Sequence, residues 1–109
     1  MPTTYRILGQ GLLTANTFTD LYRVPMGSNT IISTVNVCNT STANTTFRLL
    51  ARPNGNTTAT GQYLAFNVPV GIFDATAISL GMTLGANDVV TVFSFEGNAA
   101  VTLFGTEIS

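Results

Sequence analysis

Short runs of β-branched and aromatic residues alternate along this chain with clusters of Gly, Pro, Asn and Asp. Such spacing is typical of antiparallel sandwiches and barrels, and no helical periodicity interrupts it. The pattern predicts an all-β protein, an antiparallel β-sandwich of about eight strands with a jelly-roll or immunoglobulin-like topology. The predicted strands are Thr4–Leu8, Phe18–Val24, Thr30–Cys38, Thr45–Ala51, Gln62–Val68, Ala77–Leu80 (extended by Met82–Leu84), Val89–Phe95 and Ala100–Phe104.

Alternation within these runs predicts which side chains face the core. In the run Gln62–Val68, for example, Leu64 and Phe66 fall on one face. The run Asp88–Glu96 is apolar on both faces, so we expect this strand to be central in its sheet or covered on its outer side. The predicted core residues are Val35, Val37, Leu49, Leu64, Phe66, Ile78, Leu80, Val90, Val92 and Leu103.

The length of 109 residues suits one domain spanning residues 1–109. Its first 15 residues are more apolar than a disordered tail, although glycines at their centre weaken any strand. We therefore expect an edge strand at Thr4–Leu8, followed by an arm, Gln10–Asn16, that contacts a neighbouring subunit.

Apolar residues outside the predicted core are the candidates for an interface. The loop Val70–Phe73 carries large apolar side chains where a loop is usually polar. Two interpretations of this loop stay open, an interface or a plug that closes one end of the sandwich. The candidate interface residues, from the N-terminal segment and this loop, are Tyr5, Ile7, Leu12, Leu13, Ile72 and Phe73.

Charge is scarce in this sequence. Charged residues make up 8%, against about 25% in ordinary proteins, and Lys, His and Trp are absent. The arginines are scattered and the net charge is −1, which argues against a nucleic-acid partner. A surface with so little like-charge repulsion favours association, so we expect part of it to be covered in the working state.

Catalytic chemistry finds little support in the residue types present. Without His and with one Cys, nucleophile–base pairs and zinc sites of the usual kinds are excluded. The acidic residues are dispersed, and the glycines do not form a phosphate-binding loop. Most phenylalanines alternate with aliphatic residues, which favours core packing over a stacking surface. We expect no enzyme, and no catalytic, cofactor-binding or metal-binding residues or small-molecule substrate.

We expect no signal peptide. The start of the sequence lacks the charged and apolar regions of a signal peptide. No apolar run approaches the ~18 residues that cross a bilayer, so we expect no membrane partner.

Several short segments share a recognisable pattern that covers nearly the whole chain. They are Pro2–Gln10, Thr19–Pro25, Ser33–Asn39, Phe47-Arg48, Arg52-Pro53, Leu80–Leu84, Asp88–Val92 and Phe104–Ile108. Together they resemble a family of small virion structural proteins of tailed bacteriophages, well represented in phages of cyanobacteria. The resemblance implies a β-sandwich carried on the virus particle, and it transfers no catalytic or binding signature.

The expected function is therefore that of a virion structural protein made in the host cytoplasm. Its expected role is capsid decoration, as a cement protein that stabilises contacts between major capsid subunits. The expected partners are the major capsid protein or other virion proteins, and further copies of the chain in a homo-oligomer. A neck, tail or baseplate accessory protein is the alternative within this class. A carbohydrate- or receptor-binding β-sandwich module is the alternative from another class, and the lack of Trp counts against it.

Overall fold

The computed structural model describes residues 3–57 and 60–108, with all of their side chains except those of residues 3–5, 60 and 80. This part of the chain forms an antiparallel β-sandwich, which confirms the predicted fold class. Two single-turn 3₁₀ helices, η1 and η2, lie between the fourth and fifth strands. The elements are β1 (Thr3–Leu12), β2 (Thr17–Arg23), β3 (Asn29–Asn39), β4 (Thr45–Arg52), η1 (Pro53–Gly55), η2 (Thr60–Gln62), β5 (Tyr63–Val70), β6 (Ala75–Leu84), β7 (Val89–Ser94) and β8 (Ala99–Ile108).

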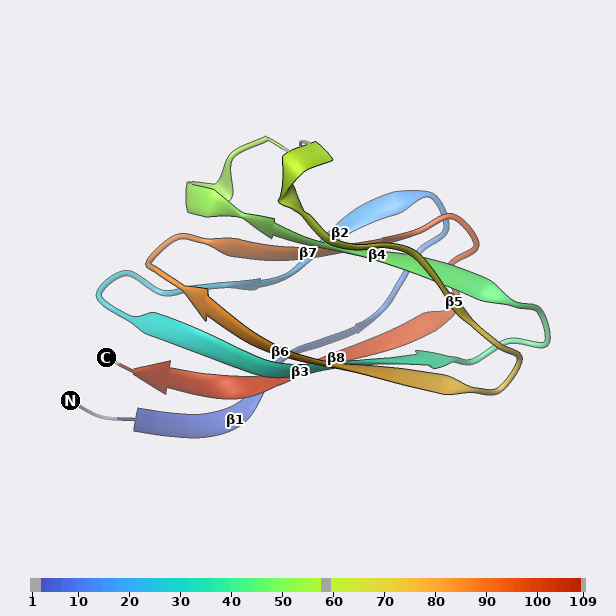
Figure 1. Ribbon diagram of the computed structural model, residues 1–109, viewed down its shortest axis with the longest axis horizontal. Coiled ribbons are helices and arrows are strands. Elements are labelled where there is room, and N and C mark those ends of the chain that lie inside the picture. Colours follow the sequence, from blue (N-terminus) through green and yellow to red (C-terminus); the bar gives the residue numbers. More distant parts are fainter. Residues whose placement is uncertain (1–2, 58–59, 109) are drawn as a thin grey trace.

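The strands form two four-stranded sheets that face each other (Figure 1). Sheet A has the order β1-β8-β3-β6, and sheet B has the order β2-β7-β4-β5. The pairs β4–β5, β3–β6, β2–β7 and β1–β8 are nested, so the chain is one long antiparallel hairpin rolled into two layers. This topology is a jelly roll, and it decides between the two topologies that the sequence left open.

The core lies between the sheets and is built mainly from aliphatic side chains. Six predicted core residues are completely buried: Val35, Val37, Leu49, Val90, Val92 and Leu103. Ile78 is half-buried and packs against this cluster, whereas the side chain of Leu80 lies outside the described part. As expected, β7 is central in its sheet, between β2 and β4. Alternation therefore predicted the inner faces of β7, β8 and the second half of β3, whereas a register shift between Ile32 and Thr34 reverses the faces in the first half of β3.

The predicted inner face of β5 is wrong. Leu64 and Phe66 are 49% and 55% exposed, while Ala65 and Val68 pack against the core. The pairing of β5 with β4 shifts register twice, and Asn67 takes a positive φ of 51°. An extra residue in one strand reverses the face on which the following side chains lie. This irregularity in an edge strand brings Leu64 and Phe66 to the outside.

The N-terminal segment belongs to the chain's own sheet, where β1 is an edge strand, as expected for Thr4–Leu8. The strand is longer than expected and takes in the first residues of Gln10–Asn16, the stretch expected to form an arm. The pairing of β1 with β8 runs from Thr3 to Leu12, and the Leu13 N–H then donates to the Ala99 carbonyl at 2.8 Å. Gly9 allows the backbone of β2 to come close, because a Cβ at this position would lie 2.5 Å from the Leu21 carbonyl oxygen. Gly9 suggested a weak strand in the sequence, but a glycine is required here, where the backbones of β1 and β2 approach each other.

Replacing one buried and one exposed phenylalanine with alanine should lower the free energy of unfolding by different amounts. Phe47 is completely buried, so Phe47→Ala should lower the free energy of unfolding by about 3–5 kcal/mol. Phe66→Ala is the matched control, and its loss should stay below about 1 kcal/mol because the ring is exposed. Urea unfolding measures both values. Equal losses for the two variants would contradict the assigned orientation of β5.

Deletion of residues 2–15 should unfold the protein. It removes β1 and the buried side chains of Leu8 and Leu13, and it leaves the β8 edge without its partner strand. Circular dichroism and thermal melting would measure the loss. A truncated chain with an unchanged melting temperature would show that β1 is dispensable for the fold.

Candidate interaction surface

The described residues contain no evident catalytic constellation. In residues 3–57 and 60–108 no three His, Cys, Asp or Glu side chains gather as they would around a metal ion. Every buried side-chain nitrogen and oxygen in this part of the chain has a hydrogen-bond partner. No unsatisfied buried polar atom here is left to mark a ligand site.

The best-developed polar cluster joins the two sheets at one end of the sandwich. Glu107 on β8 accepts hydrogen bonds from Arg6 on β1, from Nε at 3.1 Å and from Nη2 at 2.7 Å. The Tyr22 hydroxyl on β2 donates to the other oxygen of Glu107, and it lies 2.8 Å from the Thr30 hydroxyl. Side chains from both sheets thus form one network that satisfies the carboxylate.

Both acidic groups of this cluster titrate away from their ordinary values. Burial, and then the hydrogen bond to Glu107, raise the pKa of Tyr22 to about 12. The hydrogen bond from Tyr22 lowers the pKa of Glu107, and together with Arg6 it outweighs the opposing effect of desolvation. The carboxylate therefore stays ionised and the phenol neutral near pH 7. This state suits a structural link, because the neutral phenol donates to the ionised carboxylate.

A second cluster lies on the outer face of sheet B and is aromatic. We call it the Arg48 cluster; its members are Arg48, Phe18, Tyr63, Phe66, Phe93 and Phe95. The guanidinium carbon of Arg48 lies 4.1 Å from the ring centroid of Phe66 and 4.6 Å from that of Phe95, within cation–π range. Arg48 Nε also donates to Asn67 Oδ1 at 2.8 Å.

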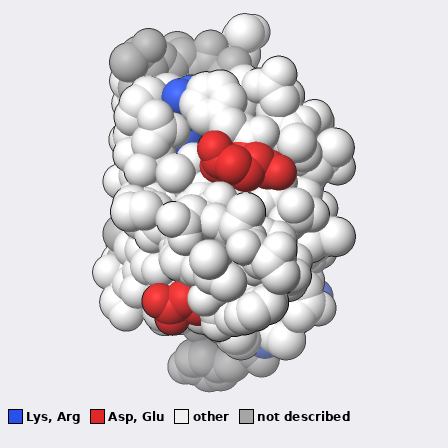
Figure 2. Space-filling model, turned by 90° about the vertical axis from the view of Figure 1, so that its right-hand side faces the viewer, with Lys and Arg blue, Asp and Glu red and all other residues white. Residues whose placement is uncertain are grey.

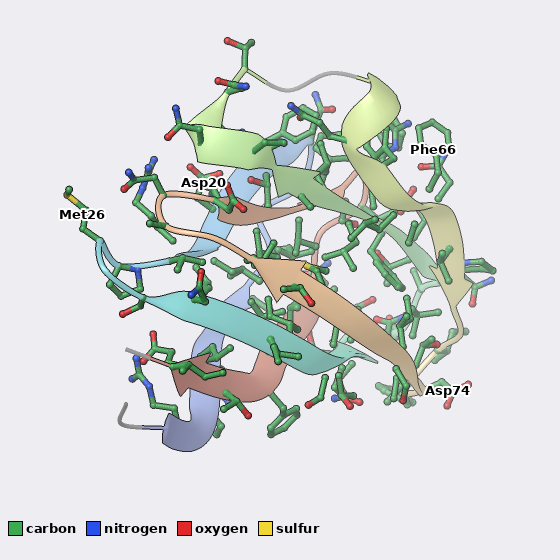
Figure 3. All side chains as sticks on the ribbon, turned by 60° about the vertical axis from the view of Figure 1, so that its left-hand side comes forward. Asp20, Met26, Phe66 and Asp74 are labelled. Atoms are coloured by element: carbon green, nitrogen blue, oxygen red, sulfur yellow. The ribbon has the colours of Figure 1, made fainter. Side chains whose placement is uncertain are left out.

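Strand register assembles the Arg48 cluster. Phe93 on β7 pairs with Arg48 on β4 and with Phe18 on β2, so these three residues form a row across the sheet. Their neighbours in register, such as Leu49 and Val92, point into the core. Phe66 on β5 extends the cluster to the sheet edge, where Figure 3 shows it standing outward from the ribbon. All four strands of sheet B contribute.

The sequence interpretation missed this surface. Alternation favoured core packing for most phenylalanines, yet Phe66, Phe95 and Phe104 are exposed. One signal was present, since the run around β7 is apolar on both faces. Phe93 is buried on the outer face, beneath the rest of the cluster.

The β5–β6 turn presents the apolar residues that the sequence singled out. Ile72 and Phe73 are 51% and 71% exposed, so the interpretation of this loop as a plug is wrong. The Asp74 N–H donates to the Gly71 carbonyl at 3.1 Å and closes the turn. Phe73 has a φ of 55°, whereas every other non-glycine residue with positive φ in the described chain is Asn. A bulky side chain in this region costs of order 1–3 kcal/mol, and such strain is typical of functional sites.

The N-terminal candidates lie in different environments. Ile7 and Leu12 are exposed on the outer face of sheet A, where Ile7 pairs with the exposed Phe104. Leu13 is 3% exposed and belongs to the core, so its expected place at an interface is wrong. Its side chain turns inward where the chain leaves β1 to cross to the other sheet. The side chain of Tyr5 lies outside the described part.

The surface at the end that carries the β5–β6 turn has few charged side chains, and these are mainly acidic (Figure 2). Figure 2 shows small acidic patches and little basic surface on an otherwise neutral face. Large apolar side chains are exposed on both outer faces and in the turns. They are Ile7, Leu12, Phe18, Met26, Ile31, Leu64, Phe66, Ile72, Phe73, Phe95 and Phe104.

Comparison with protein-family models and with curated proteins finds no match for this chain. The described residues include no helix that is long and apolar enough to span a membrane.

The hydrogen bond between Tyr22 and Glu107 should make the free energy of unfolding depend on pH in the acidic range. Because the folded-state pKa of Glu107 lies below its unfolded value near 4.5, its contribution is present above that pH and is lost as the pH falls through the folded pKa. Glu107→Gln should therefore lower the urea midpoint at pH 7 and should reduce its decline from about pH 5 to 3. A variant that declines as steeply as the wild type would show that the link contributes nothing.

Proposed function

We propose that this chain is a non-enzymatic structural protein of a tailed-phage virion, and that it decorates the capsid and binds the major capsid protein. The observation that carries the proposal is the set of large apolar side chains exposed on the outer faces of both sheets. Free proteins rarely leave such surface uncovered, and interfaces are enriched in Phe, Met and Arg and depleted in Lys. The segment pattern that resembles small virion proteins supports the same role.

The fold is compatible with this role but does not decide it. Jelly rolls occur in viral capsid proteins, and they also occur in lectins and cupins. The surface chemistry separates these uses. It offers apolar area with few charges and, in the described residues, no metal-binding group of side chains. A permanent contact with other proteins uses such a surface, whereas turnover of a small substrate does not.

The outer face of sheet A offers the contact with the shell. Ile7 and Phe104 face each other across β1 and β8, and Ile31 on β3 is exposed on the same sheet. We call these residues the Phe104 strip. A flat sheet face with apolar side chains suits a broad contact with a neighbouring protein.

A neck, tail or baseplate accessory protein stays the alternative within the class, because the same surfaces would serve there. A glycan-binding module is favoured by one observation, the exposed rings of the Arg48 cluster. Ring geometry counts against it. Tyr63 and Phe66 meet at 84°, and Phe93 and Phe95 meet at 86°, so these neighbouring rings do not form the flat platform on which a sugar stacks.

Binding to assembled shells tests the proposal. Purified protein is mixed with shells of the major capsid protein of the phage that encodes it, and co-sedimentation and electron microscopy measure the binding. We expect saturable binding and a shell that withstands higher temperature. Ile7→Ser with Phe104→Ser should abolish binding at an unchanged melting temperature, whereas the control Met26→Ser, also exposed, should bind normally.

Two results would contradict capsid decoration. Binding to isolated tails or baseplates but not to shells would support the accessory role. Binding to a glycan array, with no binding to any virion part, would support the module of the other class.

A further inference from the structure

We propose that the β5–β6 turn of one copy, Ile72–Asp74, docks on the Arg48 cluster of a second copy. This contact deepens the proposed function and rests on it, because it names the surface by which copies join one another. The shell contact on the outer face of sheet A is a separate surface. Each copy therefore carries one turn, one cluster and one shell-facing strip.

The turn has the composition of an inserting element. Its exposed side chains are two large apolar residues followed by the carboxylate of Asp74. Asp74 forms no ion pair with the described residues, and its Oδ1 accepts the Ala75 N–H at 2.8 Å. Phe73 combines a positive φ of 55° with a side chain that is 71% exposed and does not belong to the core cluster. A contact with another molecule would explain why the Phe73 ring is held exposed on a strained backbone.

The Arg48 cluster has the complementary composition. Arg6 and Arg52 each pair with a carboxylate, at 2.7 and 2.8 Å, whereas Arg48 has no such partner among the described residues. Its guanidinium is half-buried and held between aromatic rings, so its position is fixed before any partner arrives. A carboxylate is the group that a guanidinium binds best, through two parallel hydrogen bonds.

The two surfaces match in charge and in apolar character. Asp74 supplies the carboxylate that Arg48 lacks, and Phe73 supplies a ring for the exposed rings of Phe66 and Phe95. Figure 3 shows Asp74 at the end of the turn and Phe66 farther along β5, well apart, and no ion pair joins Asp74 to Arg48 within the described chain. A pairing of Asp74 with Arg48 is therefore intermolecular.

This contact joins two different patches of the chain. Two copies that make it reciprocally form a two-fold dimer, whereas copies that make it head to tail form a closed ring when the rotation between them closes, and a filament otherwise. A ring would present several Phe104 strips to the shell at once. Multivalent attachment of this kind strengthens binding without any new contact.

Charge reversal in the purified protein tests the contact. Asp74→Arg alone and Arg48→Asp alone should each weaken self-association about tenfold or more, because like charges then meet at the interface. An equal mixture of the two variants should associate again, since the arginine introduced into one variant meets the aspartate introduced into the other. Analytical ultracentrifugation measures all three samples, and melting curves show whether each variant folds.

A second variant keeps the test decisive if Arg48→Asp fails to fold. Phe73→Ser removes an exposed ring and relieves the strain of a bulky side chain at positive φ, so it should weaken association without lowering the melting temperature. Met26→Ser, on the turn between β2 and β3, is the matched control and should leave association unchanged. A monomeric wild type, or association that Asp74→Arg and Phe73→Ser leave intact, would overturn the contact.

The outcomes also separate this contact from the proposed function. A monomeric protein that still binds shells would contradict the contact between copies and would support capsid decoration. Rings that form normally but bind no virion part would support the contact and contradict capsid decoration.

Discussion

Packing between the two sheets is the interaction on which the other features depend. Each sheet contributes completely buried aliphatic side chains, such as Val35 and Val37 from β3 and Leu49 and Val92 from sheet B. Burial of apolar area, at about 25 cal/mol per Å², is the main favourable term in such a fold. Side chains alternate between the two faces of a strand. When one face packs into this core, the residues in between therefore lie on the outer face. The chain has too few charges to cover those outer faces.

The sequence predicted the fold class and the inner faces of β7, β8 and the second half of β3, where alternation is regular. It failed where the register shifts, in the first half of β3, which buries Ile32 and exposes Ile31, and in β5. A bulge reverses the face of β5, and its only sign in the sequence is Asn67, a residue that tolerates positive φ. Gly9 suggested a weak strand, whereas it serves a contact with Leu21 that exists only once the hairpin has rolled up. Long-range contacts of this kind leave no local pattern.

The candidate surfaces were predictable to unequal degrees. Ile72 and Phe73 stand out in the sequence because a turn with two large apolar residues violates the usual polarity of loops. The Arg48 cluster could not be found in this way, because its members come from four strands and meet only through the register of the sheet. The sequence showed that β7 is apolar on both faces, but not what would cover its outer side.

The placement of charge explains why the remaining surface can associate. Most carboxylates serve their own chain: Glu107 binds Arg6 and Tyr22, Asp20 binds Arg52, and Asp88 and Glu96 accept backbone N–H groups of Asn54 and Thr46. The two ion pairs neutralise the charges of Glu107 and Asp20, and the net charge of −1 leaves little repulsion between molecules. In the proposed contact between copies, apolar side chains supply most of the buried area, and the Arg48 guanidinium, held among aromatic rings, supplies direction. Orientation in such a contact comes from one charge pair, while its strength comes from the rings around it.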